Sequence, residues 1–343
     1  MKTILAAYSG VKKGSGSSIL SALHDLPSVP WLTRSKIMKY LQVISVLQFV
    51  ITFLVMGIGC SLLLMYMFCT DCWVIAAIYT AWLIYDWNTP KQGGRRSTWV
   101  RNWTVWKYFR DYFPIRLIKT HHLLPSRNYI FGYHPHGIFC FGAFCNFGTE
   151  ATGFSKIFPG IKPSLATLAG NFRLPVFRDY LMSGGICPVN RNSIDFLLSS
   201  NGTGNAVVIV IGGAAESLYC APGMNSVTLK KRKGFVKLVY KQVIFDDGSW
   251  WRTVQKRLQK ILGFAPCLFH GCGLFFPESW GLVPYCKPIA TVVGEPITVP
   301  KIEEPSQDVI DMYHAMYIRS LKSLFDNYKT RFGLNESDTL QIQ

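Results

Sequence analysis

Acidic residues are scarce in this chain of 343 residues, where 19 Asp and Glu stand against 36 Lys and Arg and the formal net charge is +17. Charged residues of both signs make up only 16% of the sequence and apolar residues 49%, so the chain is more apolar than an average soluble domain. A basic and apolar chain is attracted to anionic lipid surfaces and anionic substrates. Because no RNA- or DNA-binding motif accompanies the basic residues, we expect no nucleic-acid partner.

Several common patterns are also missing. The sequence has no phosphate loop of the Walker type and no Gly-x-Ser-x-Gly elbow, which argues against a nucleotidase and against an ordinary serine lipase. The ten cysteines are scattered along the chain without the regular spacing of a disulfide framework. Several lie inside apolar runs, as expected of reduced thiols in a cytosol-facing protein. No signal peptide is evident, because the apolar segment after Lys2 is too short.

One long segment lacks charge altogether. Residues 41–70 contain no charged side chain, and the apolar character resumes over residues 72–85. Because about 20 apolar residues span a bilayer, residues 41–85 predict a transmembrane hairpin of two spans, with its break between Gly57 and Asp71. A buried core hairpin of a soluble domain is the alternative.

Basic residues flank this segment on both sides. Arg34, Lys36 and Lys39 precede it, and Lys91 and Arg95 are the first of several that follow. The positive-inside rule therefore places both tails in the cytosol. We divide the chain into a flexible cytosolic tail (residues 1–40), the transmembrane hairpin (41–86) and a cytosolic, membrane-associated domain (87–343).

Residues 99–113 interleave aromatic rings with cations, among them Trp99, Arg101 and Lys107. This spacing is typical of a helix that lies in the lipid headgroup layer. An aromatic core helix is the alternative. We expect Pro114 to end the helix.

Two histidines follow a short aromatic run. Residues 129–133 predict a buried strand, and His134 and His136 come directly after it, around Pro135 and before Gly137. A strand that delivers two imidazoles to an apolar cleft suits the removal of a proton from an alcohol. Two core histidines on a tight turn are the alternative, and a metal pair fits less well because no further ligand lies nearby at ligand spacing. The apolar segment 138–147 is expected to begin a helix against the membrane.

A second strand is predicted over residues 205–211, where β-branched residues dominate. Gly212 and Gly213 follow it and allow a close approach of backbone to a ligand, and Glu216 lies where strand-end chemistry occurs in α/β sheets. A solvated loop acid is the alternative for Glu216. The cations Lys231, Arg232 and Lys233 suit phosphate groups, or else form a solvated face.

The C-terminal part predicts two strands within residues 287–300, around Gly294, and then a long helix. The helix begins near Ser306 and ends at Gly333. Its apolar stripe consists of Val309, Met312, Tyr313, Met316, Tyr317, Leu321, Leu324 and Phe325.

Four motifs in this order carry a resemblance: Tyr-Phe-Pro at 112–114, Tyr-His-Pro-His-Gly at 133–137, Gly-Gly-Ala-Ala-Glu-Ser at 212–217 and Arg-Lys-Gly-Phe at 232–235. Behind an N-terminal hairpin, they resemble the type-2 diacylglycerol acyltransferases and their monoacylglycerol and wax-alcohol acyltransferase relatives. The resemblance covers nearly the whole chain. It implies an α/β fold like that of the glycerolipid acyltransferases, a mixed sheet flanked by helices.

The resemblance also implies a reaction, the esterification of diacylglycerol by long-chain acyl-CoA to triacylglycerol, at the endoplasmic reticulum membrane and on lipid droplets. Retinol and monoacylglycerol stay open as further acceptors. Acyl-CoA is then a co-substrate, and neither a cofactor nor a metal is expected. Membrane lipid is an expected partner, while a homo-oligomer and other enzymes of lipid synthesis stay open.

The motifs assign candidate site residues. His134 and His136 are catalytic, and the acid that orients them comes from elsewhere, because the positions five residues later are Phe139 and Phe141; Glu216 is the candidate. Phe53 and Leu54 belong to a stretch similar to a lipid-binding motif of the family. The other substrate-binding candidates are Tyr112, Phe113, Pro114, Gly137, Arg173, Gly212, Gly213, Lys231, Arg232 and Lys233, with Arg173 and the three later cations assigned to coenzyme A phosphates.

One departure from the family pattern follows Leu238. A block of somewhat under twenty residues that includes a strand is absent there, and the loss of an interior strand leaves the ladder groups of its neighbours unpaired. A second function is therefore open, in which this chain is a catalytically impaired isoform that binds membrane lipid or a partner protein.

Overall fold

A four-stranded parallel sheet organises the structure, a computed structural model that describes residues 34–213, 226–227, 241–242, 250, 253–255, 257, 269–273, 280–300, 302, 304 and 306–342. The strand order is β2 (Tyr129–Tyr133), β5 (Asn205–Val210), β3 (Lys162–Thr167) and β4 (Ile186–Pro188). The two strands predicted at the motifs are confirmed and are neighbours, with Tyr133 opposite Val210. β5 is the buried central strand that its β-branched run predicts, whereas β2 is half-buried.

Shorter strand pairs surround this sheet. β1 (Arg116–Lys119) runs parallel to β10 (Ala290–Val293), and β6 (Ser226–Val227) runs parallel to β11 (Gln341–Ile342). β7 (Lys241–Gln242), β8 (Phe269–Cys272) and β9 (Trp280–Gly281) form an antiparallel group. The expectation of two strands within residues 287–300 is wrong, because β10 forms alone there and pairs with a strand far away in the sequence. The fold is a mixed α/β fold with parallel sheets and helices.

Short helices connect and cover the strands. They are η2 (Thr89–Gln92), α5 (Thr98–Arg101), α6 (Thr104–Tyr112), α7 (Phe141–Ala143), η3 (Phe144–Gly148), α8 (Phe154–Ile157), η4 (Ala169–Arg173), α9 (Phe177–Ser183), α10 (Arg191–Asp195) and η5 (Phe196–Ser200). α6 ends just before Pro114, as its sequence predicts.

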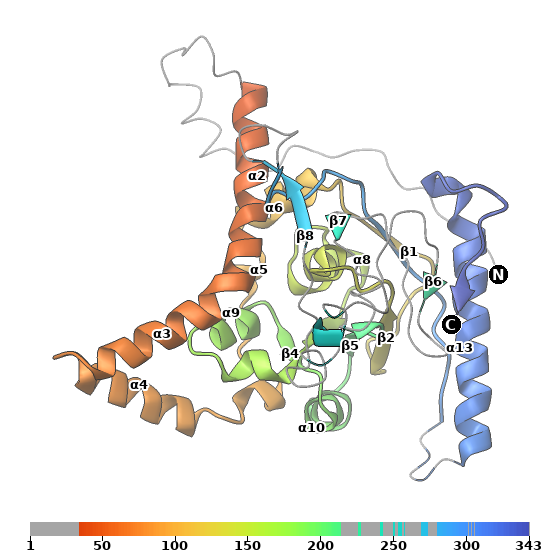
Figure 1. Cartoon of the computed structure of the whole chain (residues 1–343). Coiled ribbons are helices and arrows are strands. Elements are labelled where there is room, and N and C mark those ends of the chain that lie inside the picture. The colour runs from red at the N-terminus through yellow and green to blue at the C-terminus, as the bar shows by residue number, and fades with distance from the viewer. Residues whose placement is uncertain are drawn as a thin grey trace.

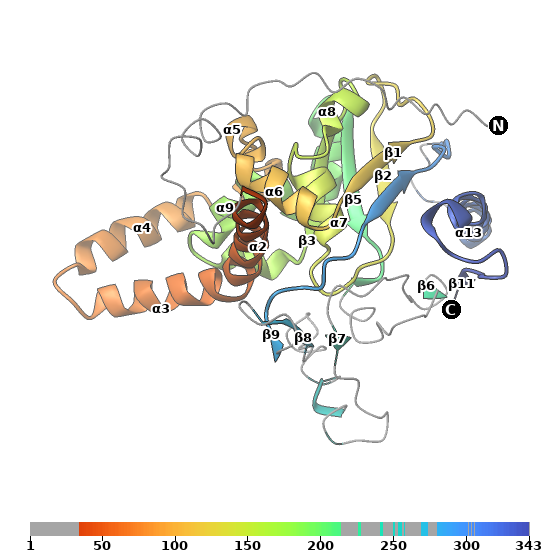
Figure 2. The same ribbon diagram turned by 90° about the horizontal axis from the view of Figure 1, so that it is seen from above.

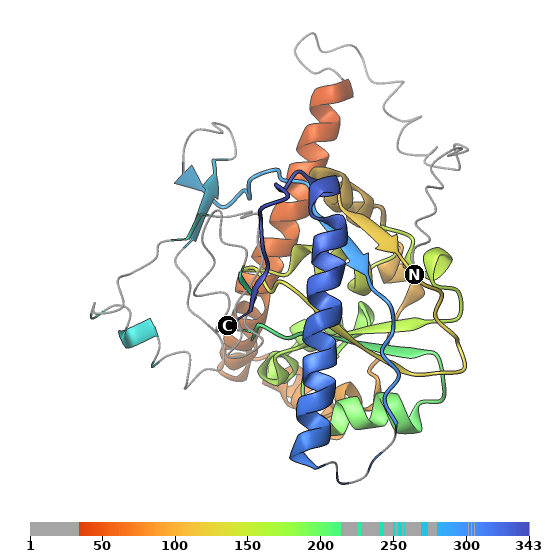
Figure 3. The same ribbon diagram turned by 90° about the vertical axis from the view of Figure 1, so that its right-hand side faces the viewer.

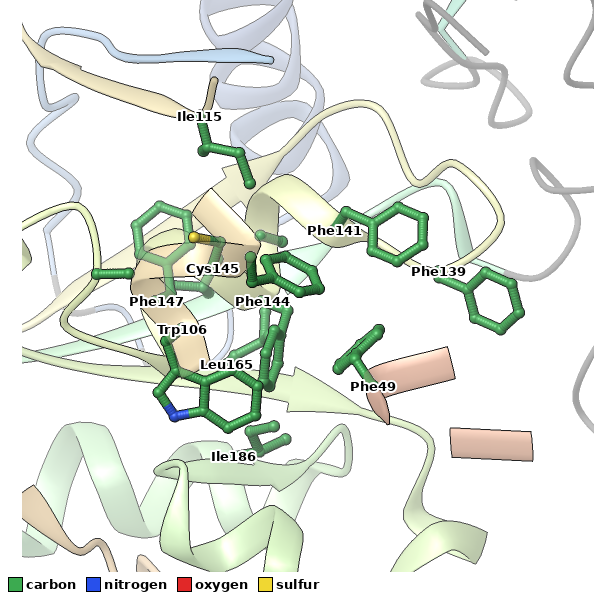
Figure 4. Packing of buried hydrophobic residues seen from close by; sticks show 14 of the residues in the cluster. Phe49, Trp106, Ile115, Phe139, Phe141, Phe144, Cys145, Phe147, Leu165 and Ile186 are labelled. Carbon is green, nitrogen blue, oxygen red and sulfur yellow. The ribbon is translucent and has the colours of Figure 1, made fainter. Parts of the chain in front are cut away.

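The core of the domain is built from aromatic rings (Figure 4). Phe109 of α6 and Phe144 of η3 pack around Phe49 of the N-terminal helix, with ring centroids 5.4 and 4.4 Å from that of Phe49. Two expectations are therefore wrong. Segment 138–147 turns into the core instead of facing the membrane, because its rings fill the space beneath the sheet. α6 likewise buries Trp106 and Phe109 in the core instead of lying in the headgroup layer.

Arg101 belongs to this core and not to a membrane surface. Its side chain is fully buried and its guanidinium donates to Glu150 Oε1 at 2.9 Å. The same guanidinium donates to the carbonyl oxygens of Phe147, Thr149 and Gly184. One cation therefore joins α5 to η3 and to the end of α9.

Replacing Arg101 by methionine is expected to lower the free energy of unfolding by about 3–5 kcal/mol, because Glu150 and the carbonyl groups lose their donor inside the protein. Thermal unfolding of the purified protein in detergent measures the loss. Arg191→Met is the matched control, since the Arg191 side chain is 92% exposed in its pair with Asp195. Equal melting temperatures for the two variants would contradict this account of Arg101.

A long apolar helix enters the core from the N-terminal side. It comprises α2 (Arg34–Ile51), a π-helical turn η1 (Thr52–Met56) and α3 (Gly57–Phe68), and the 33 residues Lys36–Phe68 are long and apolar enough to cross a membrane. A turn over residues 69–72 leads into α4 (Trp73–Tyr85), which folds back along α3. The α3–α4 hairpin projects from the body of the molecule (Figures 1 and 2).

This arrangement refines the expected hairpin. Asp71 lies in the turn at its tip, and Gly57 is within a continuous helix. The second leg, α4, has 13 residues, about 20 Å of helix, which is less than the hydrocarbon thickness of about 30 Å. α2 begins at Arg34, so the boundary expected at residue 40 falls inside a helix, while most of the expected tail lies outside the described residues.

Ion pairs fix the base of the hairpin. Asp86 follows α4 directly, and its carboxylate accepts from the buried guanidinium of Arg178 at 2.8 Å and from Arg95. Beside them, α3 crosses the domain at Gly57, where a Cβ would overlap the side chain of Leu174. The hairpin is therefore joined rigidly to the domain at its base.

The C-terminal helix α13 (Gln307–Tyr328) lies on the other side of the molecule from the hairpin (Figures 1 and 3). Ser306 caps it by accepting from the Val309 amide, and η6 (Thr330–Phe332) extends it to Gly333, whose φ of +81° ends the helical path. Both predicted ends are confirmed. Leu324 packs against Gly294 at the end of β10.

Candidate functional site

The histidine loop, residues 134–137, begins where β2 ends. Since the strands of this sheet are parallel, the carboxyl ends of β2 and β5 lie at one edge, and the Ile211 amide donates to the Tyr133 carbonyl at 3.3 Å. Ligands bind at such edges in open α/β sheets. Gly137 has φ +61°, which L-residues with side chains rarely adopt, and this permits the sharp turn behind His136. The Cys140 thiol donates to the His136 carbonyl at 2.9 Å and closes the turn.

His134 points to α13. Its Nε2 lies 2.9 Å from the hydroxyl oxygen of Tyr317, and its Nδ1 is buried without a hydrogen-bond partner among the described residues. Burial lowers the pKa of His134 to about 4, because the charged imidazolium loses its hydration inside the protein. The ring is therefore neutral at pH 7.

His136 is held by its own loop. Its Nδ1 lies 2.6 Å from the carbonyl oxygen of Gly137, and because a carbonyl can only accept, Nδ1 carries the proton. In the neutral ring Nε2 then holds the lone pair. Burial lowers the pKa of His136, and the bond to the Gly137 carbonyl opposes this in part. His136 is thus held in the tautomer and charge state that a general base requires.

A large cavity of about 2210 Å³ lies at this loop. Its wall includes β2, the histidine loop, β10 and residues of α13, together with Arg116 of β1. Ligand pockets usually have volumes of about 300–1,000 Å³, so this cavity exceeds the usual range by a factor of more than two, which suits a reaction between two long-chain molecules.

The apolar N-terminal helix reaches this cavity through aromatic contacts. The ring of Phe53 in η1 lies 5.6 Å, edge to face, from the ring of Phe139, and Phe139 follows the histidine loop and lines the cavity. Leu54 is 38% exposed on the outer side of the same turn. A path of apolar side chains thus connects the membrane helix with the histidines.

Basic side chains of β1, α13 and η6 line the cavity. Arg116, Arg319 and Arg331 line the cavity, and none of them is paired with an acid among the described residues. Lys329, nearby, is paired with Asp326 at 3.0 Å. The three arginines form a positive rim that faces the cavity.

The Tyr-Phe-Pro motif supports the cavity wall. The Tyr112 hydroxyl donates to the Pro284 carbonyl at 2.5 Å, and the Phe113 carbonyl accepts from the Ile289 amide at 3.0 Å. Pro114 itself lines the cavity. The motif therefore fixes the segment that leads into β10.

The other expected site residues divide into three groups. Gly212 and Gly213 follow β5 beside the histidine loop, and Gly213 has φ +57°. Arg173 is exposed at the end of η4 and does not line the cavity, so its assignment to coenzyme A stays a prediction. Glu216, Lys231, Arg232 and Lys233 lie outside the described residues.

Sequence reasoning missed Tyr317 and the three arginines of the rim. The sequence places Tyr317 in the apolar stripe of α13, and its hydroxyl does not distinguish it from Tyr313 in the same stripe. Arg116, Arg319 and Arg331 are isolated cations in the sequence, and only the fold brings them together.

Comparison with known proteins gives a consistent result. A family model described as "Diacylglycerol acyltransferase" matches residues 65–239 and 237–343. Three proteins named diacylglycerol O-acyltransferase 2 align over the whole of both chains: that of Danio rerio is 85% identical, that of Xenopus tropicalis 66% and that of Homo sapiens 62%. No solved structure matches.

The same comparisons bear on the junction after Leu238. The two matched segments of the family model meet at residues 237–239. The alignment with the Danio rerio protein runs over 360 positions for the 343 residues here, so at least 17 positions have no residue in this chain. The split of the family-model match supports the predicted absence of a block at this junction, and the alignment length agrees with the size of that block. The match over most of the sequence, together with the full-length relatives, shows that the chain belongs to the diacylglycerol acyltransferase family.

Proposed function

We propose that the chain transfers the acyl group of a long-chain acyl-CoA to the free hydroxyl of diacylglycerol and so forms triacylglycerol and coenzyme A. The observation that carries the proposal is a buried, neutral His136, held in the tautomer of a base at the edge of a large cavity. Family membership supports the same reaction, since the relatives are named for it. We also propose that the mixed α/β fold is of the glycerolipid-acyltransferase type.

In this reaction one C–O bond forms and one C–S bond breaks. His136 Nε2 takes the proton of the alcohol as its oxygen attacks the thioester carbon, and negative charge develops on the carbonyl oxygen. The coenzyme A thiolate then leaves and takes the proton back from the imidazolium. We assign Glu216 to the support of that imidazolium, and backbone amides near Gly137 and Gly213 to the oxyanion.

The two substrates approach from different sides. Diacylglycerol reaches the cavity from the membrane along Phe53 and Phe139. The phosphates of acyl-CoA bind the positive rim of Arg116, Arg319 and Arg331, because guanidinium groups bind phosphate in a bidentate way. Lys231, Arg232 and Lys233 extend this rim in the proposal.

Replacing Arg319 and Arg331 together by alanine is expected to raise the KM for acyl-CoA by about tenfold or more, since each tenfold corresponds to about 1.4 kcal/mol of binding. The kcat should change little, because neither side chain is near the reacting atoms in the proposal. Kinetics with varied oleoyl-CoA in microsomes check this. Arg191→Ala, at an exposed site outside the cavity, is the control. The KM of Arg173→Ala for acyl-CoA tests whether Arg173 binds a coenzyme A phosphate. An unchanged KM in the double variant would remove the rim from the proposal.

The helix Lys36–Phe68 is long and apolar enough to cross a membrane, which supports membrane association of the protein. We propose the endoplasmic reticulum and the surface of lipid droplets as its locations, with the α3–α4 hairpin in the bilayer and both termini in the cytosol. Modification of the histidines in intact microsomes by a reagent confined to the lumen, and not by one confined to the cytosol, would overturn this topology.

The function is tested by expressing the chain in cells that lack their own diacylglycerol acyltransferases and following labelled oleate into triacylglycerol. The same chain with the junction segment of the Danio rerio relative inserted after Leu238 is tested in parallel. Background signal from both forms, with normal amounts of membrane-bound protein, would overturn the assignment.

A second function is favoured by the junction. In it, this chain is a catalytically impaired isoform that binds lipid or pairs with a complete enzyme. The family-model match is split at residues 237–239, and the alignment with the Danio rerio relative has more positions than this chain has residues. Signal from the restored form and background from the chain as it stands would support this alternative.

A further inference from the structure

The hydrogen bond between His134 and Tyr317 takes no part in proton removal by His136. The two residues are 183 positions apart, and α13 brings the Tyr317 hydroxyl to 2.9 Å from His134 Nε2. The same hydroxyl lies against the backbone of β2 at Gly132, where a Cβ would overlap it. The glycine thus leaves room for the tyrosine directly beside the catalytic loop.

The burial of His134 decides the direction of this hydrogen bond. If Tyr317 donated to Nε2, the proton of the neutral ring would lie on Nδ1, which is buried without a partner among the described residues. Orphaned N–H donors are rarer in proteins than under-satisfied acceptors. The proton therefore lies on Nε2, which donates to Tyr317 Oη, and Nδ1 keeps a lone pair.

This direction has a consequence for Tyr317. Its oxygen accepts from His134, and its own proton is available to another acceptor. The ring lines the cavity, and no other hydrogen bond of the hydroxyl is formed within the described part of the chain. Burial raises the pKa of Tyr317 to about 12, so the hydroxyl keeps its proton at neutral pH.

We propose that Tyr317 is a further catalytic residue, whose hydroxyl is oriented by His134 and donates a hydrogen bond to the thioester carbonyl oxygen as that oxygen gains negative charge. His136 is then the base, and His134 is a positioning residue that acts through Tyr317. No proton leaves Tyr317 in this step, since it only stabilises the oxyanion. The inference rests on the proposed acyl transfer and divides the work of the two histidines within it.

The first test is Tyr317→Phe, which keeps the ring against Gly132 and removes only the hydroxyl. The kcat for triacylglycerol formation should fall about 10²–10³-fold, as for the loss of one oxyanion donor, with a small change in KM. Tyr85→Phe is the matched control, because Tyr85 is 90% exposed at the end of α4, outside the cavity, and this variant should keep its kcat. The variants are made in the chain as it stands and in the form with the restored junction, so that inactivity caused by the junction does not hide the result.

A double-mutant cycle separates positioning from direct catalysis. If His134 acts only through Tyr317, His134→Ala should lower kcat strongly in the parent and by less than about threefold in the Tyr317→Phe background. His134→Gln, which keeps an N–H donor, should retain more activity than His134→Ala.

Two results would overturn the inference. One is a kcat of Tyr317→Phe within a few fold of the parent, and the other is a full, additive loss from His134→Ala in the Tyr317→Phe background, which would make His134 a base. The failure of the proposed function looks different, because the parent chain and the form with the restored junction would then both give only background triacylglycerol.

Discussion

Replacing His136 by alanine is expected to abolish triacylglycerol formation, with a loss of about 10²–10⁴-fold for the base alone. His136 lines the cavity and its Nε2 holds the lone pair in the tautomer fixed at Gly137, whereas His134 Nδ1 is buried and His134 Nε2 is joined to Tyr317. We expect His134→Ala to be severely impaired as well, through the loss of Tyr317 alignment. Labelled oleate in triacylglycerol measures both variants in the form with the restored junction.

The pH dependence gives this experiment an independent check. Because burial lowers the pKa of His136, the base form is populated at and below the ordinary pKa of about 6.5. The rate should therefore be flat from about pH 8 down to about pH 6.5 and fall only at lower pH.

Near-normal turnover in both histidine variants would refute the role of this loop. Membrane-bound protein amounts, measured on the same samples, exclude loss of the protein as the cause.

Inserting the family segment after Leu238 is expected to raise the activity of the chain from a low level to that of its full-length relatives. The alignments leave at least 17 positions without a residue here. An interior strand lost from a sheet leaves buried backbone groups unpaired, at about 1–3 kcal/mol for each. A few such groups equal a large part of the 5–15 kcal/mol that stabilises an ordinary domain.

The comparison needs equal expression and a matched insert. A segment of the same length and of polar, glycine-rich composition serves as the control, because it restores the spacing without the strand. If the chain as it stands already forms triacylglycerol as fast as the restored form, the missing block is dispensable and the impaired-isoform alternative fails. Sequencing of transcripts across the junction shows which of the two forms is made.

The local patterns predicted the elements around the histidines well. The aromatic run before His134 and the β-branched run before Gly212 become β2 and β5, and each ends at the motif that follows it. Ser306 and Gly333 likewise mark the ends of the last helical segment, because caps and left-handed glycines are local chemistry. Such features depend on a few neighbouring residues, so they can be predicted from the local sequence.

Contacts between distant segments escaped prediction. The spacing of rings and cations around Arg101 is the same for a headgroup helix and for a core helix, and only the position of Glu150 and of three carbonyl groups shows which one forms. The partner of His134 comes from a helix 183 positions away. For β10, alternation indicates a strand but not which strand it pairs with. Burial and register are properties of the assembled fold.

The packing of Phe139 on Phe53 has a mechanical consequence. Since the base of the hairpin is clamped to the domain at Asp86 and Gly57, a tilt of the apolar helix cannot be absorbed at that joint. A bilayer that thins or curves tilts helices to match their hydrophobic length. Such a tilt would shift Phe53 and, through the contact of the two rings, Phe139 and the segment behind His136. The thickness of the lipid around this protein would therefore alter the position of its catalytic loop.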